Sequence, residues 1–155
     1  MYAGNDQSEW YMIKEDIKDD MLLLDFLRDH GCYSVKRGCE TSNCGLCTVW
    51  MDEKPILSCG MLVARANGHE ITTLEGLEKE AHEFAVFMAN EGAEQCGFCS
   101  PGLIMNVLAM DKELDHPNVD EINHYLAGNL CRCTGYMGQL RAVEKYLARD
   151  KEGKA

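Results

Sequence analysis

The sequence predicts an α+β protein in which a mixed N-terminal unit is followed by a C-terminal four-helix bundle. Strand-like segments are confined to the first half of the chain, whereas apolar residues at helical spacing dominate the second half. The nine cysteines also fall into two groups, which a cysteine-free stretch from residue 60 to residue 95 separates. We therefore expect two domains, spanning residues 1–75 and 76–155.

The N-terminal unit is expected to contain one short helix and several strands. Leu23, Phe26 and Leu27 share one helical face. Asp20 can cap this helix, and Gly31 suits the position just after its end. The predicted strands are 48–51, 56–57 and 70–73, with residues 52–54 as the turn between the first two.

Four helices are predicted in the C-terminal unit. The first ends near Gly92, and the second begins with Ser100 as N-cap and Pro101 at the first helical position. Asn118 and Glu121 have the spacing of a capping box at the start of the third helix. The fourth helix is indicated by three apolar residues, which are Leu140, Val143 and Leu147.

Composition disfavours several classes of partner. The formal net charge is −11, which argues against a nucleic-acid groove or an anionic membrane surface as the binding partner. Apolar runs such as Met21–Leu24 are far shorter than the ~20 residues of a membrane-spanning helix. No export signal is predicted in residues 1–15. We therefore expect a cytoplasmic protein without nucleic-acid or membrane partners.

The cysteine content is the most informative feature of the composition. Nine cysteines can form disulfides, bind zinc or bind an iron–sulfur cluster. Nine is an odd number, and disulfides are rare in a reducing compartment. The sequence therefore favours metal-bound thiolates over disulfides.

The first group of cysteines has the spacing of a plant-type [2Fe–2S] site. Cys39, Cys44 and Cys47 are separated by four and two residues, and Cys59 follows after eleven more. Residues 39–47 have no periodicity and are predicted to form a loop that wraps around the cluster. Zinc remains the alternative, but its sites are usually built from paired Cys-x2-Cys hooks, which this segment lacks.

The second group is less specific when considered alone. Cys96 and Cys99 form one pair, and Cys131 and Cys133 form another, with 31 residues between the two pairs. Two pairs can hold zinc or a [2Fe–2S] cluster. The single residue between Cys131 and Cys133 is unusual for a zinc hook and favours iron. Cys32 belongs to neither group and is expected to be a small core residue.

Two segments around the second group resemble a known family. Residues 94–102 (EQCGFCSPG) and 128–136 (GNLCRCTGY) are similar to the two motifs of the small iron–sulfur subunit of molybdenum hydroxylases. This family includes xanthine dehydrogenase, aldehyde oxidoreductase and carbon monoxide dehydrogenase. Residues 71–77 (ITTLEGL) look like its interdomain junction, and the resemblance runs from about Met21 to Leu147.

The resemblance implies a plant-ferredoxin-like β-grasp domain followed by the helical domain, with one [2Fe–2S] cluster in each. It implies one set of ligands in each domain: Cys39, Cys44, Cys47 and Cys59 in the first, and Cys96, Cys99, Cys131 and Cys133 in the second. Gln95 matches a glutamine that hydrogen-bonds the molybdopterin, and Cys133 matches a ligand whose surroundings contact the pterin amine. Molybdopterin and FAD would be bound by partner chains, a large molybdopterin-binding subunit and an FAD-binding subunit.

The function that the resemblance implies is electron transfer within a heteromeric oxidoreductase. The chain would relay electrons from the molybdopterin through its two clusters towards the flavin, with no substrate site or catalytic residue of its own. Purines such as xanthine, or other N-heterocycles, are the expected substrates of the whole enzyme. The alternatives are a subunit of an aldehyde or carbon monoxide dehydrogenase, and a free-standing soluble ferredoxin.

The chain departs from the family pattern at two places. Many relatives have glycines between the first two cluster ligands, where this chain has residues 40–43 (ETSN). The family also usually begins with a strand, an Asn-Gly-type turn and a second strand, whereas only residues 1–4 precede Asn5 and Asp6 here. The first strand is therefore expected to be either very short or replaced within residues 1–20.

Overall fold

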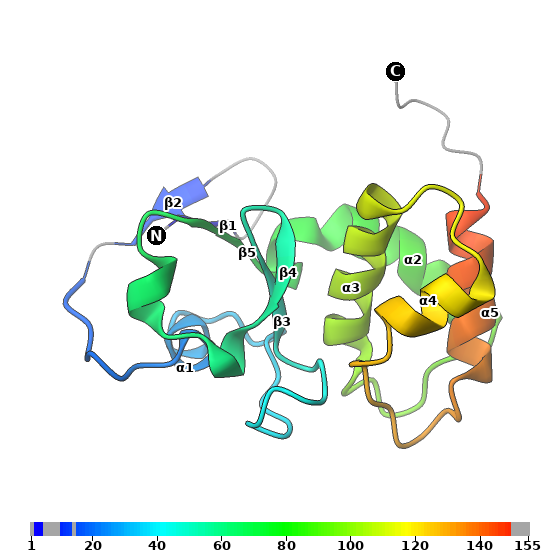
Figure 1. Ribbon diagram of the computed structural model, residues 1–155, viewed down its shortest axis with the longest axis horizontal. Helices are drawn as coiled ribbons and strands as arrows, with labels where there is room; N and C mark the ends of the chain where they lie inside the picture. Colours follow the sequence, from blue (N-terminus) through cyan, green and yellow to red (C-terminus); the bar gives the residue numbers. More distant parts are fainter. Residues whose placement is uncertain (1, 5–9, 14, 150–155) are drawn as a thin grey trace.

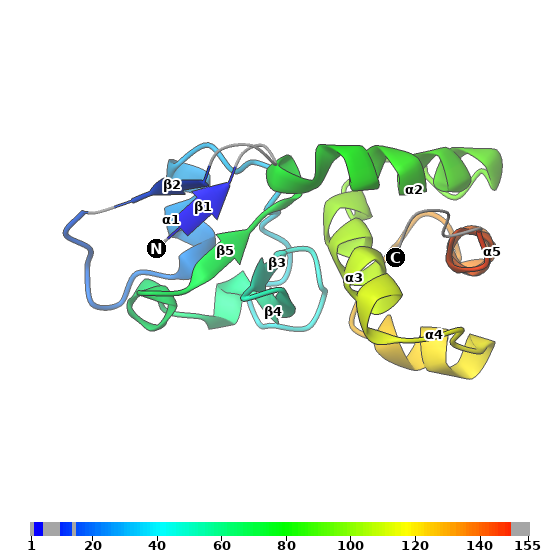
Figure 2. The same cartoon turned by 90° about the horizontal axis from the view of Figure 1, so that it is seen from above.

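The fold has two parts that lie side by side, a small sheet with one helix and a group of helices (Figures 1 and 2). The computed structural model describes residues 2–4, 10–13 and 15–149. The helices after residue 77 lie on one side of the sheet, and α3 lies between the sheet and the remaining helices (Figure 2). Among the residues that the structure describes, no helix has the length and apolar character needed to cross a membrane.

The described residues of the N-terminal part form a five-stranded sheet in the order β2-β1-β5-β3-β4. β1 pairs in parallel with β5, and the other neighbours are antiparallel. The strands are β1 (Tyr2–Gly4), β2 (Trp10–Met12), β3 (Thr48–Met51), β4 (Lys54–Leu57) and β5 (Glu70–Thr72). The first strand is thus very short, which was one of the two expectations for the atypical N-terminus, while Asn5 and Asp6 lie outside the described residues.

The hairpin between β3 and β4 has a two-residue turn. Asp52 and Glu53 both have positive φ, at 50° and 64°, as a tight hairpin turn of the mirror-image type requires. Lys54 pairs with Met51 and belongs to the strand, so the predicted turn 52–54 was one residue too long. Asp52 is held in this conformation because its carboxylate accepts a hydrogen bond from the backbone N–H of Glu70 at 3.0 Å.

The helix of the N-terminal part, α1 (Leu23–Asp29), buries its apolar face, and Gly31 follows it with a φ of +86°, as predicted. The predicted cap by Asp20 was wrong, because the residue before the helix is Leu22 and no side chain caps it. The carbonyl of Met61 accepts a hydrogen bond from the N–H of Leu23 at 2.8 Å instead. A neighbouring backbone segment therefore satisfies one of the donors that a side-chain cap would have taken.

Three short 3₁₀ helices connect the strands and lead into the helical part. They are η1 (Ser58–Gly60), η2 (Val63–Ala66) and η3 (Leu74–Leu77). The last of them carries Glu75, whose carboxylate accepts hydrogen bonds from the backbone N–H of Ser34 at 2.8 Å and its hydroxyl at 2.5 Å. Because of these bonds, the segment between the two parts is fixed to the loop that follows α1.

The C-terminal part consists of α-helices around a shared apolar core, in which Phe84, Val107 and Tyr146 are fully buried. The helices are α2 (Glu78–Asn90), α3 (Ser100–Glu113), α4 (Val119–Tyr125) and α5 (Met137–Leu147). Figure 2 shows α5 between α2 and α4, on the side of the molecule remote from the sheet.

One of the two predicted helix starts in this part is confirmed. Asn118 and Glu121 form a complete capping box, in which the Asn118 side chain accepts from the backbone N–H of Glu121 at 3.1 Å. The cap predicted at Ser100 was wrong, since α3 begins at Ser100 and Cys99 precedes it. No side chain caps α3, and the Ser100 hydroxyl donates to the carboxylate of Glu94 at 2.5 Å.

Trp50 connects the sheet to the helices. It lies on β3, is buried and belongs to the core of the helical part rather than to the core under α1. Its indole N–H donates to the carbonyl of Met105 on α3 at 2.9 Å, and the Lys112 ammonium lies 4.5 Å from the centre of its ring. This contact joins two segments that lie 55 residues apart in the sequence.

We expect Trp50→Phe to destabilise the protein by about 2 kcal/mol, because it removes one buried hydrogen bond and leaves a small cavity between β3 and α3. Thermal or urea unfolding of the metal-loaded protein measures this loss. An unchanged free energy of unfolding would contradict the role assigned to this contact.

Candidate metal centres

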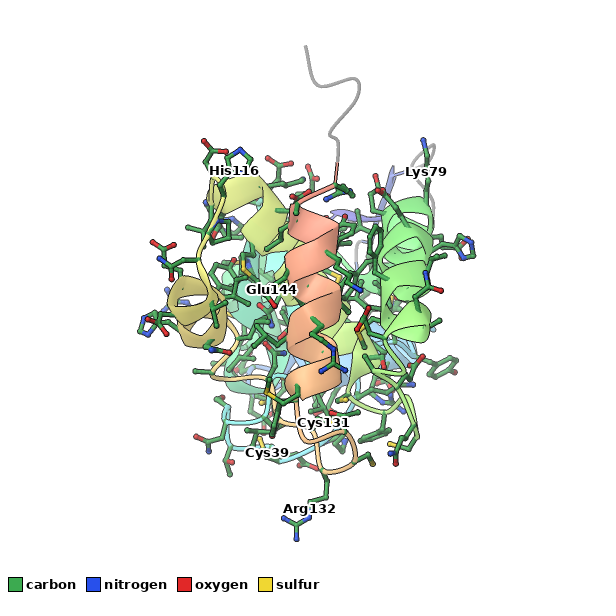
Figure 3. All side chains as sticks on the ribbon, turned by 90° about the vertical axis from the view of Figure 1, so that its right-hand side faces the viewer. Cys39, Lys79, His116, Cys131, Arg132 and Glu144 are labelled. Carbon is green, nitrogen blue, oxygen red and sulfur yellow. The ribbon has the colours of Figure 1, made fainter. Side chains whose placement is uncertain are left out.

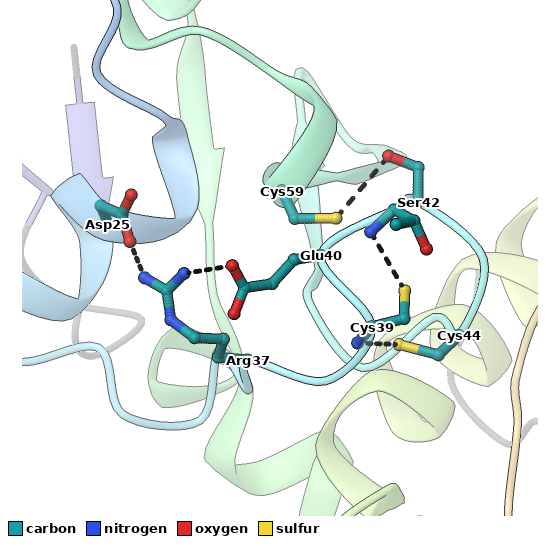
Figure 4. A network of polar contacts seen from close by, with 8 residues as sticks. Asp25, Arg37, Cys39, Glu40, Ser42, Cys44 and Cys59 are labelled. Carbon is teal, nitrogen blue, oxygen red and sulfur yellow. Dashed lines mark hydrogen bonds and ion pairs between the residues drawn. The ribbon is translucent and has the colours of Figure 1, made fainter.

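The first four predicted ligands lie on two neighbouring segments. Cys39, Cys44 and Cys47 belong to the predicted irregular loop 39–47, and Cys59 lies in η1 (Figure 4). Cys44, Cys47 and Cys59 are buried, and Cys39 is half-buried. Their sulfurs are arranged in pairs, since the thiol of Cys39 is hydrogen-bonded to that of Cys44, and the thiol of Cys47 to that of Cys59.

Backbone N–H groups of the loop point at the sulfurs. The Cys39 sulfur accepts from the N–H groups of Thr41 and Asn43, at 3.4 and 3.3 Å, and the Cys44 sulfur accepts from the N–H of Cys39 at 3.4 Å. Positive φ values at Glu40 and Ser42, 55° and 58°, turn the loop so that these donors face inward. The departures from the glycine-rich family pattern therefore still allow the backbone geometry that a sulfur-wrapping loop needs.

The base of the loop is fixed by charge and by close packing. Arg37 forms ion pairs with Asp25 on α1 and with Glu40 in the loop, the second at 3.0 Å (Figure 4). A side chain at Gly38 would put its Cβ 2.9 Å from the sulfur of Cys44, so glycine is needed there. The ion pair between Arg37 and Asp25 thus holds the beginning of the loop against α1, and Gly38 packs closely against the sulfur of Cys44.

The first group of thiols has divergent acidities. A hydrogen bond from the Thr41 side chain, followed by the N–H bonds of the loop, lowers the pKa of Cys39 to about 6. Burial raises the pKa of Cys47 to about 11. The loop therefore stabilises negative charge on Cys39. Cys47 loses its proton readily only when a metal binds to its sulfur.

The second four predicted ligands come from two loops at the ends of helices. Cys96 and Cys99 precede α3, and Cys131 and Cys133 precede α5. The sulfurs of Cys96 and Cys133 lie 3.6 Å apart, and the thiols of Cys99 and Cys131 are hydrogen-bonded to each other. Each pair therefore takes one sulfur from each loop.

Side-chain donors lie against the sulfurs of this second group. The Thr134 hydroxyl donates to the sulfur of Cys131 at 3.2 Å, and the Gln139 amide donates to that of Cys99 at 3.8 Å. The Tyr136 hydroxyl accepts from the N–H of Cys131 at 3.0 Å. Burial raises the pKa of Cys99 to about 11. Sequence reasoning missed Thr134, Gln139 and Tyr136, although two of them lie within the segment 128–136.

The paired sulfurs fit a two-iron cluster better than a single ion. A [2Fe–2S] cluster takes two protein ligands at each iron, and both groups offer two such pairs. A structural zinc ion takes four ligands around one point. Cys32 belongs to neither group of predicted ligands and is buried in the core under α1, the core to which Cys47 and Cys59 also belong.

The two groups differ in their exposure. Cys96 and Cys133 are exposed, as is Gln95 beside them. Large apolar side chains around them are also exposed, namely Phe98 (47%), Leu130 (49%), Tyr136 (45%) and Met137 (60%). Arg132 points away from the body of the protein at the same end (Figure 3). This end therefore combines a thiol pair with an apolar surface, as an interface with another chain would.

The two ligand loops touch each other directly. The N–H of Leu130, next to Cys131, donates to the carbonyl of Cys44 at 3.0 Å. Gly45 packs against the first turn of α3, where a Cβ on Gly102 would lie 2.1 Å from the Gly45 carbonyl oxygen. We call this contact of Cys44 and Gly45 with Gly102 and residues 128–130 the seam.

Comparison with known families matches both parts of the chain. The family model described as "2Fe-2S iron-sulfur cluster binding domain" covers residues 12–82, and the one described as "[2Fe-2S] binding domain" covers residues 73–144. The chain is 50% identical over 118 residues to the xanthine dehydrogenase iron-sulfur-binding subunit of Escherichia coli O157:H7, covering 74% of each protein. The chain belongs to the iron–sulfur subunits of the molybdenum hydroxylases.

Other molybdenum hydroxylase subunits are similar over most of their length. The nicotinate dehydrogenase small FeS subunit of Eubacterium barkeri is 40% identical, with 80% of each chain covered. A chain of quinoline 2-oxidoreductase from Pseudomonas putida 86 matches with a TM-score of 0.83 and 32% identity, covering 95% of this chain and 91% of that one. Like its relatives, this iron–sulfur subunit is an electron-transfer component of an oxidoreductase, and it contains two [2Fe–2S]-binding domains, of which the first is ferredoxin-like.

The low pKa of Cys39 predicts selective alkylation in the metal-free subunit. With a pKa of about 6, Cys39 is mostly thiolate at pH 7 and mostly protonated at pH 5, so its reaction with iodoacetamide should slow about tenfold between these values. Cys47, with a pKa of about 11, should react far more slowly at pH 7. Mass spectrometry of timed samples measures both rates, and equal reactivity of all nine cysteines would contradict this prediction.

The seam predicts a sharp difference between two glycines. Gly102→Ala places a Cβ against the backbone of Gly45 and should destabilise the subunit by roughly 1–3 kcal/mol. Gly128→Ala is the matched control, because a Cβ there meets nothing within 4 Å, and its effect should stay within about 0.5 kcal/mol. Urea unfolding of both variants measures the loss in free energy of unfolding. A loss for Gly102→Ala as small as that for Gly128→Ala would mean that the seam tolerates a side chain.

Proposed function

We propose that this subunit relays electrons one at a time between two [2Fe–2S] clusters, from a molybdopterin on one partner chain towards FAD on another. The observation that carries the proposal is the hydrogen bond from the Leu130 N–H to the Cys44 carbonyl at 3.0 Å. It joins a residue next to a ligand in one group to a ligand in the other. When bound, a [2Fe–2S] cluster supplies one-electron redox chemistry.

The proposed ligands follow the two groups of cysteines. Cys39, Cys44, Cys47 and Cys59 hold the first cluster, and Cys96, Cys99, Cys131 and Cys133 hold the second. The pairing of sulfurs in both groups supports this assignment. The N–H groups of Thr41 and Asn43 stabilise negative charge on the first group, and the Thr134 hydroxyl does so on the second.

The second group faces the molybdopterin subunit in this proposal. Cys96, Cys133 and Gln95 are exposed and are bordered by apolar side chains that another chain would cover. Gln95 donates its amide to the pterin, and Cys133 lies nearest to it. The first group then lies on the side of the FAD-binding subunit. A free-standing ferredoxin would have no reason to present such an apolar border around its thiols.

The proposed architecture follows the same division. Residues 1–75 form a β-grasp domain and residues 76–155 a four-helix bundle, and the sheet order together with α2 to α5 supports both. The complex is proposed to work in the cytoplasm.

The substrates of relatives favour N-heterocycles for the whole enzyme. The relatives named above act on xanthine, nicotinate and quinoline by their names, all of which contain ring nitrogen. We propose that the complex of this subunit hydroxylates a purine or another N-heterocycle, and that the substrate binds to the molybdopterin subunit.

Cys99→Ser tests the relay in the assembled enzyme. We expect substrate binding to stay nearly intact, one cluster's electron paramagnetic resonance (EPR) signal to disappear and electron flow to the acceptor to fall sharply, because a ligand of the second cluster is lost. Cys32→Ala is the control, since Cys32 is a buried thiol outside both groups, and it should keep both signals. Unchanged turnover with one signal missing would refute the relay.

A further inference from the structure

The seam is supported by a polar network that the cluster ligands do not explain. Asn106 lies on α3 and faces the sheet. Its side-chain amide donates to the hydroxyl of Thr48 on β3 at 3.2 Å and to the side-chain carbonyl of Asn129 at 3.0 Å. These partners lie 58 and 23 residues away in the sequence, and on opposite sides of the seam.

The network ends on the backbone of the first ligand loop and on a side chain of the second. The Thr48 hydroxyl donates to the carbonyl of Gly45 at 2.7 Å, and Gly45 follows the ligand Cys44. Asn129 lies two residues before the ligand Cys131, and its side-chain nitrogen is 2.6 Å from the place where a Cβ of Gly45 would stand. A continuous chain of hydrogen bonds therefore runs from Gly45 through Thr48 and Asn106 to Asn129.

The residues of this network are partly or fully buried, so breaking its hydrogen bonds costs free energy. Thr48 is only 4% exposed, and Asn106 and Asn129 are half-buried between the sheet, α3 and the loop before α5. Polar groups in such a place cost free energy unless they are paired, so the arrangement that keeps these hydrogen bonds is favoured over neighbouring ones. The same arrangement brings the Leu130 N–H onto the Cys44 carbonyl.

We propose that Asn106 is a positioning residue that holds the two ligand loops in register and so sets the separation between the two clusters. The effect on the cluster separation rests on the proposed function, whereas the contact between the two ligand loops does not depend on it. Asn106 does not ligate iron. It acts through Thr48 and Asn129, on the backbone that carries Cys44 and Cys131.

Asn106→Leu in the assembled, metal-loaded enzyme tests the proposal, with Asn90→Leu at the exposed end of α2 as the matched control. Hydrogen–deuterium exchange at the Leu130 amide should accelerate about tenfold, because the bond to the Cys44 carbonyl opens more often. The magnetic interaction between the two reduced clusters, measured by EPR, should weaken. Iron content should stay at the wild-type value, and Asn90→Leu should change none of the three.

Thr48→Val provides a second variant of nearly the same shape, should Asn106→Leu fail to assemble. It removes the hydroxyl that links Asn106 to Gly45 and should produce the same two changes. Wild-type exchange at Leu130 together with a wild-type magnetic interaction, in either variant, would overturn the proposal. Loss of iron from an assembled Asn106→Leu enzyme would also overturn it, because Asn106 would then be required for ligation and not for spacing.

The same measurements separate this proposal from the proposed function. If the wild-type enzyme itself lacked one of the two cluster signals, the relay would fail. Exchange at the Leu130 amide would still report on whether Asn106 holds the seam.

Discussion

The approach of Gly45 to the first turn of α3 is the contact on which the arrangement of both metal centres depends. The backbones meet so closely that a Cβ on Gly102 would lie 2.1 Å from the Gly45 carbonyl oxygen. Because neither residue has a side chain, the loop of the first cysteine group reaches the loop that precedes Cys131. The hydrogen bond from Leu130 to Cys44 is possible only at this range. Trp50 supports this contact because its hydrogen bond to Met105 joins β3 to α3.

The two centres are built by different means, and their surroundings match different neighbours. The first is enclosed by its own loop, whose backbone N–H groups surround Cys39, and three of its four cysteines are buried. The second draws hydrogen bonds from side chains, and Cys96 and Cys133 remain exposed. Hydrogen bonds to sulfur and burial tune the reduction potential of an iron–sulfur cluster. Two clusters bound at these sites, as proposed, would therefore have different surroundings.

Features determined by neighbouring residues were predictable from the sequence, whereas those determined by distant contacts were not. The capping box of Asn118 and Glu121 closes within four residues, and it formed as predicted. Ser100 has the same cap chemistry, but it is already the first residue of α3 and caps nothing. Cysteine spacing predicted both groups, yet the pairing of sulfurs across loops depends on how the helices pack. Asn106 has no motif around it, since its partners come from another strand and another loop.

The central claim is that each group of four cysteines binds two bridged irons. Quantitative analysis of iron and acid-labile sulfide in freshly isolated, anaerobically handled protein tests it most directly. Two iron atoms and two sulfides per group give four of each per chain, and this is the result that we predict. A chain that carries zinc, or far fewer than four irons without labile sulfide, would contradict the account.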